Sequence, residues 1–387
     1  EASHQIHSNP ELNYEESFAH DLLAGILADA GLEVERSACG LDTAFIARAG
    51  TRGPTIAVLL EYDALPEIGH ACGHNIIATA GLGAGLAAAS LAEDLGGRVV
   101  VMGTPAEEGG GGKILMAREG AFDGVDAALM VHPAGFDLAR MDVIAVQELT
   151  AVYRGEAAHA AAFPHRGRNA LDAAVLGYMN VAALRQHIRP TERVHGIFAE
   201  AGDKPNIVPA RARTEWMVRS GSIRTLQPLK ARVAACLEAG ATAAGCEVEL
   251  RWKPVVYADM LDNEVLVGLY SANSEQLGRP VAEPDPRQAV VGSTDMGNVS
   301  YLVPSIHPMV QAAPTGVPIH TPEFATSARG EMGDDAVIHG ALALAWTVAD
   351  LWLQDGLLDA VRAEFEATMA AVGPDARRSA IEGGVDA

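Results

Sequence analysis

Three continuous apolar runs, partly β-branched, alternate with helical or glycine-rich segments in the first third of the chain. They cover residues 55–60, 99–103 and 127–131. A run without polar alternation is typical of a strand that is buried on both faces, as in a parallel sheet. Strands that alternate with helices build a sheet with helices packed on its faces. The sequence therefore predicts an α/β fold with a mainly parallel sheet.

The pattern changes between residues 143 and 258, where short strands and longer helices are typical of a small α+β sandwich. The α/β character returns after residue 259, and a chain of 387 residues is long enough for two domains. We therefore predict a discontinuous domain of residues 1–147 and 259–387, with a mixed, mainly parallel sheet flanked by helices. An α+β sandwich of residues 148–258 is inserted into it.

The net charge of −22 excludes some partners. Such a charge repels phosphate backbones and anionic membrane surfaces, so we expect neither nucleic acid nor a membrane as partner. Cysteines stand only at positions 39, 72, 236 and 246, too far apart for a dense disulfide framework, which favours a reducing compartment. No apolar run reaches about 18 residues, and the first residues lack a charged and then apolar leader. We therefore expect a cytoplasmic protein.

Polar side chains follow each apolar run. Glu61 and Asp63 come after the first run, Glu107 and Glu108 after the second, and His132 at the end of the third. The carboxyl ends of parallel strands share one edge of the sheet, where α/β proteins bind their ligands. We therefore expect these side chains to lie close together.

The segment 69–75 adds a thiol and two imidazoles to this set. Cys72 and His74 are suitable ligands for a borderline-soft cation such as zinc. By itself the segment also fits a buried thiol beside an incidental histidine. The glycine-rich run 81–85 weakly matches a dinucleotide-binding turn, but it lies within an alanine-rich helical stretch, so we attribute it to close helix packing.

Adjacent carboxylates such as Glu107 and Glu108 repel each other, so they need a compensating positive charge, which a metal ion supplies. One can bind the ion while the other takes a proton from water. A solvated acidic loop is the alternative for this pair, and a structural role is the alternative for His132 and for His320. The occurrence of several such clusters at strand ends favours a metal site.

Several ordered motifs resemble one known family. They are Glu61-Tyr62-Asp63-Ala64-Leu65-Pro66, His70-Ala71-Cys72-Gly73-His74-Asn75, Pro105-Ala106-Glu107-Glu108-Gly109-Gly110 and Val131-His132-Pro133. Together they resemble the amidohydrolase branch of the aminoacylase and glutamate-carboxypeptidase superfamily of dinuclear metallopeptidases. Auxin-conjugate, hippurate and aminobenzoyl-glutamate hydrolases belong to this branch. The resemblance extends from residues 7–12 to 320–324, and the stretch 292–300 is most similar to the aminobenzoyl-glutamate hydrolase and β-alanyl-dipeptidase subgroup.

The resemblance implies two divalent cations per subunit, zinc or manganese. The ligands that it implies are Cys72, His74, Glu108, His132 and His320. Glu107 is then the general base, and Asp63 resembles the carboxylate that orients a ligand histidine. Carboxypeptidase relatives have an aspartate in place of Cys72, and which ligand bridges the metals stays open.

In the inserted domain, the segment 155–160 resembles the part of the family whose histidine reaches an active site, often that of the partner. His159 is then a donor to the tetrahedral oxyanion, with a surface-loop histidine as the alternative. Asn206 and Arg219 are similar in place to substrate-contacting residues, although Arg211 and Arg213 lie close to Arg219. The resemblance also implies that the inserted domain is a lid that closes over the substrate and that it forms a homodimer.

The predicted function is hydrolysis of the amide bond of N-acyl amino acids or dipeptide-like substrates, of the aminobenzoyl-glutamate or β-alanyl-dipeptide type. Glu107 takes the proton of a water molecule that the cations polarise. The alternatives are N-carbamoyl amino acid hydrolysis or exopeptidase activity on the same scaffold, and a metal-binding protein without catalysis.

Overall fold

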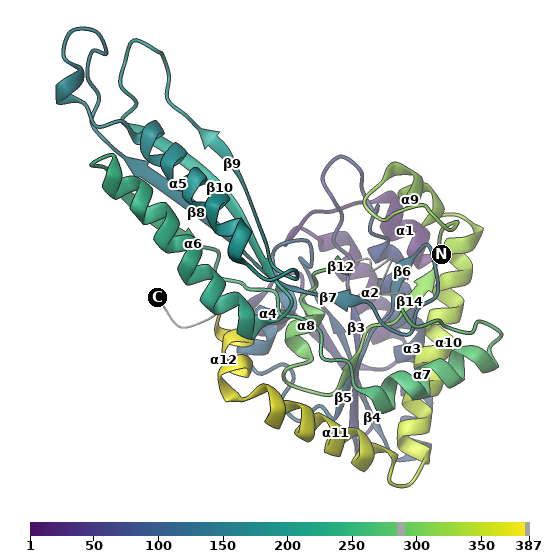
Figure 1. Cartoon of the computed structure of the whole chain (residues 1–387). Coiled ribbons are helices and arrows are strands. Elements are labelled where there is room, and N and C mark those ends of the chain that lie inside the picture. Colours follow the sequence, from purple (N-terminus) through teal and green to yellow (C-terminus); the bar gives the residue numbers. More distant parts are fainter. Residues whose placement is uncertain (285–290, 384–387) are drawn as a thin grey trace. The chain divides into compact units, whose positions relative to one another are not determined.

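The computed structural model describes residues 1–284 and 291–383, and the chain divides into two compact units. Unit 1 consists of Glu1–Val143 and Met260–Arg377, and unit 2 of Ile144–Asp259 with the C-terminal residues from Arg378 on. The first and last thirds of the chain therefore build one unit together (Figure 1).

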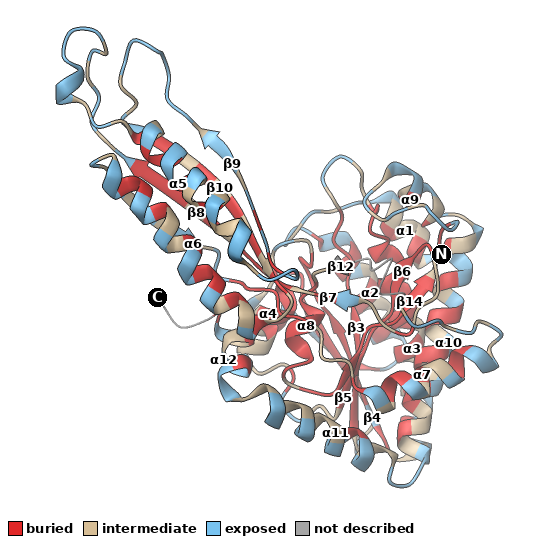
Figure 2. Cartoon of the chain, in the orientation of Figure 1, coloured by how far each residue is buried: buried red, intermediate tan, exposed pale blue. Residues whose placement is uncertain are grey.

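The main sheet of unit 1 has the strand order β1-β2-β4-β3-β5-β13. Its strands are β1 (Glu33–Arg36), β2 (Phe45–Ala49), β3 (Thr55–Leu60), β4 (Arg98–Gly103), β5 (Ala127–Leu129) and β13 (Ser305–Ile306). The strands β4, β3, β5 and β13 run parallel, and β1 and β2 pair antiparallel at one edge. Every residue of β3 is buried, as the unbroken apolar run predicts (Figure 2). The predicted fold class is confirmed.

Helices cover both faces of this sheet. They are α1 (Ala2–Ser8), α2 (Ser17–Asp29), η1 (Ala38–Gly40), α3 (His74–Leu95), α4 (Gly112–Arg118), α7 (Glu264–Gln276), α8 (Met296–Val299), α9 (Pro322–Ser327), α10 (Glu331–Leu353) and α11 (Leu357–Val372), with α12 (Pro374–Glu382) near the C-terminus. Ile56, Val58 and Leu60 of β3 pack in a core with α3 and α10, whereas Ala57 and Leu59 pack on the other face with α4 and α8. The side-chain alternation of one strand thus supplies both cores.

Short strand pairs extend unit 1 beyond the main sheet. β6 (His132–Ala134) pairs parallel with β14 (Met309–Gln311), and β7 (Asp142–Val143) pairs parallel with β12 (Val291–Gly292). Since β6 follows β5 and β14 follows β13, the chain continues from both strands toward the edge where the predicted site lies.

Helices α3 and α10 are long and apolar enough to cross a membrane by length and composition alone, but 67% and 50% of their most apolar windows are buried inside the structure. The two helices pack against each other (Figure 1). A Cβ on Gly81 would lie 2.8 Å from Leu60 Cδ1, and one on Gly85 would lie 2.4 Å from Val101 Cγ2. The glycines of α3 therefore permit close packing on the sheet, and burial accounts for its composition.

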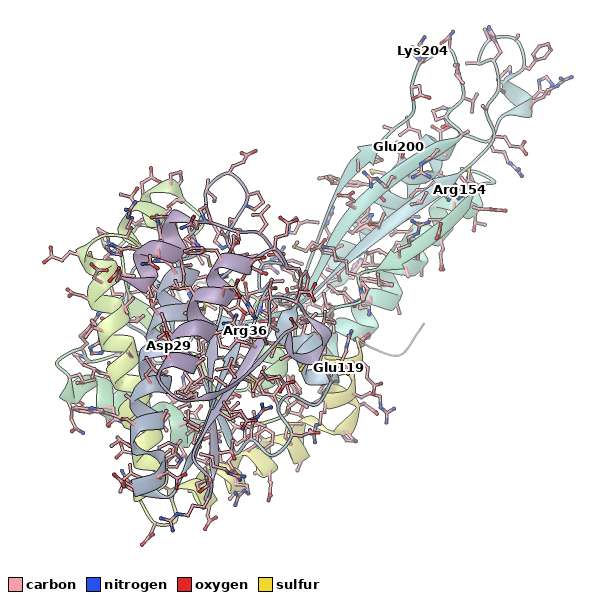
Figure 3. All side chains as sticks on the ribbon, turned by 180° about the vertical axis from the view of Figure 1, so that it is seen from behind. Asp29, Arg36, Glu119, Arg154, Glu200 and Lys204 are labelled. Atoms are coloured by element: carbon pink, nitrogen blue, oxygen red, sulfur yellow. The ribbon has the colours of Figure 1, made fainter. Side chains whose placement is uncertain are left out.

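Unit 2 is an antiparallel sheet of order β11-β8-β10-β9. Its elements are β8 (Ala145–Arg154), η2 (Pro164–Arg166), α5 (Ala170–Leu184), η3 (Arg185–His187), β9 (Arg193–Glu200), β10 (Arg211–Ser220), α6 (Ile223–Ala243) and β11 (Glu247–Trp252). Alternate residues of β10 are buried, and the helices pack on that face. Arg154 and Glu200 lie on the strands, and Lys204 lies in the loop beyond them (Figure 3).

Candidate functional site

The predicted cluster forms at the carboxyl edge of the main sheet of unit 1. Cys72 and His74 lie at the start of α3, directly after the segment that follows β3. Between them, Gly73 has a φ of 77°, and a Cβ there would lie 2.6 Å from Pro133 Cγ. Only glycine fits this left-handed position against the Pro133 ring, so Gly73 lets the Cys72–His74 turn approach the end of β5.

All five side chains predicted as ligands come together here. Cys72 Sγ lies 3.5 Å from His132 Nε2, and His320 Nε2 lies 3.2 Å from Glu108 Oε1. Each of several sets has ligand atoms within 4.8 Å of one another: Cys72, His74 and His132; Cys72, Glu108 and His320; His74, Glu107 and Glu108; and Glu61, Glu107 and Asp295. Side chains that span almost 250 positions of the sequence therefore converge on one place.

His320 reaches the cluster through an unusual backbone conformation. Its φ is 63°, which is rare for a residue with a side chain, and its backbone N–H donates to Ala71 O at 2.8 Å. This hydrogen bond ties the loop before α9 to the turn that carries Cys72. His320 is the most exposed member of the cluster, with 48% of its side chain accessible.

The chemistry of these donors fits divalent cations. Thiolate, imidazole and carboxylate together suit zinc, and imidazole with carboxylate suits manganese. His74 Nε2 and Glu61 Oε2 are buried without a hydrogen-bond partner. Unpaired polar atoms in the interior are costly, and a bound cation removes that cost.

Asp63 is a buried carboxylate that contacts two parts of the cluster. One oxygen lies 3.1 Å from His74 Nδ1, and the other accepts from the Glu108 backbone N–H at 2.9 Å. Burial raises the pKa of Asp63, but His74 and the backbone N–H groups of Glu107 and Glu108 outweigh burial and hold that pKa below its ordinary value. Asp63 is therefore ionised, and it leaves Nε2 of His74 as the free nitrogen.

The adjacent carboxyl groups of Glu107 and Glu108 are driven in opposite directions. Burial and the negative charges of Glu61 and Glu108 raise the pKa of Glu107 well above its ordinary value. Burial also disfavours ionised Glu108, but His320 and His74 lower its pKa. One carboxyl group therefore tends to carry a proton while its neighbour stays ionised, a division that suits an acid–base group beside a ligand.

A buried lysine behind the cluster was not predicted from the sequence. Lys113 is 0% exposed, and its ammonium donates to Glu61 Oε1 and, at 2.7 Å, to Asp295 Oδ1. Its backbone N–H also donates to Asp295 at 3.0 Å. Lys113 follows the glycine run after Glu108, but only the tertiary structure brings it to Asp295. Another buried histidine, His307, has its ring centroid 5.4 Å from that of His132.

A cavity with a volume of 470 Å³ opens beside these groups. Cys72, Glu107, Glu108, His132 and His320 line it together with apolar side chains, which include Phe136, Met141, Met309, Val317 and Ile319. A cavity of this size accommodates a small organic group.

In unit 2, His159 and Asn206 lie on neighbouring segments, because the Ala160 N–H donates to Asn206 O at 3.0 Å. Both residues are exposed, and His159 Nδ1 accepts from the Ala162 N–H at 3.2 Å. Arg219 lies on β10, partly buried, and burial lowers its pKa. In the described parts of the chain, Arg211 and Arg213 pair with Glu200 and Glu215, whereas Arg219 has no carboxylate within ion-pair distance.

The fold and this cluster define a two-domain α/β peptidase, a hydrolase of carbon–nitrogen bonds. The chain belongs to peptidase family M20/M25/M40, whose family model matches residues 57–329. The predicted relationship to this superfamily is confirmed.

Among its relatives, a Xaa-Arg dipeptidase of Mus musculus is 40% identical over 379 residues, which cover 94% of this chain and 88% of the relative. One of the proteins that make up the p-aminobenzoyl-glutamate hydrolase of Escherichia coli (strain K12) is 30% identical over 437 residues, with 94% and 90% covered.

Two solved structures show the same fold. An aminobenzoyl-glutamate utilization protein from Klebsiella pneumoniae has a TM-score of 0.74 at 20% identity, with 91% of this chain and 95% of that chain covered. A dinuclear metal-binding peptidase of the M20 family from Bacillus subtilis has a TM-score of 0.71 at 20% identity, with 90% and 96% covered.

Proposed function

We propose that this chain hydrolyses the amide bond of N-acyl amino acids or dipeptide-like substrates with the help of two divalent cations, zinc or manganese. The observation that carries the proposal is the convergence of the thiol, imidazole and carboxylate ligands at one sheet edge. Relatives named Xaa-Arg dipeptidase and p-aminobenzoyl-glutamate hydrolase support the substrate class, because both names describe an amide bond to an amino acid.

In this proposal Cys72, His74, Glu108, His132 and His320 hold the cations, which supply Lewis-acid activation of water and of the amide carbonyl. Glu107 accepts a proton from the attacking water and delivers it to the leaving nitrogen. The raised pKa of Glu107 supports this role, since a carboxyl group of raised pKa holds the proton between the two transfers.

The cavity supports an assignment of the two halves of the substrate. The amine half carries a carboxylate, which apolar walls beside Glu107 and Glu108 disfavour by desolvation and by repulsion. We therefore place the acyl half in the cavity. For the amine half we propose Asn206 and Arg219 as carboxylate contacts, and His159 as a donor to the oxyanion.

We also propose that unit 2 forms a homodimer. Met179 on α5 is 60% exposed and Ile197 on the edge strand β9 is 61% exposed. Large apolar side chains on a helix and on an adjacent edge strand are typical of a surface that another chain covers. The free cysteines of the described chain support the expectation of a reducing, cytoplasmic location.

Metal-dependent hydrolysis tests the function. The protein is stripped with a chelator, reloaded with zinc or manganese, and assayed on benzoyl, aminobenzoyl, β-alanyl and carbamoyl amino acids and on longer peptides. We expect hydrolysis of acyl amino acids or dipeptides only after reloading. Exclusive cleavage of carbamoyl amino acids or of longer peptides favours the corresponding alternatives, and no cleavage with full metal loading favours a binding protein.

A further inference from the structure

Glu61 and His74 present unpaired atoms to each other inside the cluster. Both side chains are 0% exposed, and Glu61 Oε2 and His74 Nε2 lie 3.7 Å apart without a hydrogen-bond partner. This distance is too long for a hydrogen bond between them. Two buried atoms that face each other in this way need a third group between them.

The opposite ends of both side chains are already fixed. Glu61 Oε1 accepts a hydrogen bond from the Lys113 ammonium, and His74 Nδ1 contacts Asp63 at 3.1 Å. The free atom of each side chain is therefore held in place by a buried ionic partner. Such support from a neighbouring group is typical of residues that bind a metal ion.

The separation matches two ligands of one cation. Bonds of about 2.0–2.2 Å to zinc allow two ligand atoms of the same ion to lie up to roughly 4.3 Å apart. Glu61 Oε2, at 3.7 Å, is closer to His74 Nε2 than Glu108 Oε1 at 3.9 Å or Glu107 Oε2 at 4.0 Å. Among these carboxylates, Glu61 is therefore well placed to share a cation with His74.

We propose that Glu61 is a further metal ligand, whose Oε2 binds the same divalent cation as His74 while Lys113 holds its other oxygen. The inference rests on the metal centre of the proposed function and adds a carboxylate to the ligands that the sequence implies. It also assigns Lys113 a part, since its ammonium neutralises Glu61 and Asp295 on the side away from His74.

Metal affinity in two Glu61 variants tests the inference. Glu61→Gln keeps the shape and removes the charge, and Glu61→Asp keeps the charge but shortens the side chain by one methylene. Each is titrated with zinc in competition with a chromophoric chelator. We expect one of the two cations to bind more than about 100-fold more weakly in both variants, beyond the roughly 10–100-fold loss seen when a residue only orients a ligand. The visible spectrum of the cobalt-loaded protein changes as well, since one ligand is lost.

Asp295→Asn is the matched control, because Asp295 shares Lys113 with Glu61. We expect its zinc affinity to stay within about threefold of the unmodified protein. Equal losses in the Asp295 and Glu61 variants mean that Glu61 acts only as a counterion of Lys113, and they overturn the proposal. Unchanged affinity and cobalt spectra in the Glu61 variants overturn it too.

Circular dichroism shows whether the variants are folded. If neither Glu61 variant folds, anomalous diffraction from zinc-loaded crystals of the unmodified protein decides: the proposal requires Glu61 Oε2 within about 2.2 Å of a zinc ion, and a clearly longer distance refutes it. These measurements need no substrate. A protein that binds zinc through Glu61 but cleaves no amide disproves only the proposed function.

Discussion

His74 Nδ1 lies 3.1 Å from Asp63 Oδ1, and the second oxygen of Asp63 accepts the backbone N–H of Glu108 at 2.9 Å. A single buried carboxylate therefore sets the ring orientation of one proposed ligand and the backbone position of another. This arrangement explains why the short segment after β3 matters as much as the ligands themselves, and it leads to the first of five predictions.

Asp63→Asn removes the charge that holds the His74 ring. We expect zinc to bind about 10–100-fold more weakly, because residues that orient a metal ligand contribute at this level. Competition with a chelator measures the loss. Asp126→Asn is the control, since Asp126 accepts the Thr55 N–H at the opposite end of β3. Equal affinities in the two variants contradict the role given to Asp63.

Glu107→Gln tests the general base. We expect the metal content to stay near normal and kcat to fall by about 10²–10⁴-fold, because glutamine cannot accept the proton of water. Metal analysis and steady-state kinetics on the same preparation separate the two effects. Glu119→Gln, at an exposed position on the protein surface, should leave both unchanged (Figure 3). A fully active Glu107→Gln enzyme refutes the assignment.

Lys113→Met leaves Glu61 and Asp295 without their buried counterion. We expect metal-free protein to lose about 3–5 kcal/mol of unfolding free energy, as when one partner of a buried ion pair is removed. Urea unfolding measures this. In Lys253→Met, where the lysine is 49% exposed and pairs with Glu148, the loss should stay below about 1 kcal/mol. Similar losses in both variants mean that Lys113 has no special structural role.

The pH dependence of stability depends on Glu16. Its side chain is 0% exposed and accepts from Thr43 Oγ1 and the Ala106 N–H, but burial raises its pKa from 4.5 to about 7. Between these values the folded protein holds a proton that the unfolded chain releases, so stability falls as the pH rises from 4.5 to about 7. The loss amounts to about 3 kcal/mol.

Denaturation of metal-free protein across this pH window measures the effect. Glu16→Gln cannot titrate, so we expect its unfolding free energy to depend less steeply on pH than that of the unmodified protein. Parallel pH profiles of the two proteins exclude Glu16 as the titrating group.

The cavity predicts the selectivity for the acyl group. With a constant amino acid on the amine side, we expect kcat/KM to be about tenfold or more higher for benzoyl and hexanoyl than for succinyl substrates, because apolar walls favour uncharged groups. Met141→Asp adds a carboxylate to the cavity wall and should shift the preference toward β-alanyl substrates, whose ammonium pairs with it.

Met332→Asp is the matched control for this shift, because Met332 lines a different cavity, beside Arg279. The same selectivity in all three proteins, or faster cleavage of succinyl substrates by the unmodified enzyme, contradicts the placement of the acyl half.

The sequence by itself determined the sheet and the positions of the clusters. The unbroken apolar run of β3 predicts burial on both faces, and the polar residues that follow β3, β4 and β5 predict one functional edge, because parallel strands end on the same side. The family resemblance named the ligands that the structure then brings together.

Only the tertiary structure decided which partners complete the site. In the sequence Lys113 is an ordinary lysine after a glycine run, and its contact with Asp295 joins residues 182 positions apart. The orphan oxygen of Glu61 becomes visible only when its distance to His74 is known. Hydrophobic periodicity is a local property that the chain carries along its length, whereas the pairing of buried charges depends on which distant segments pack together, and no local pattern records that choice.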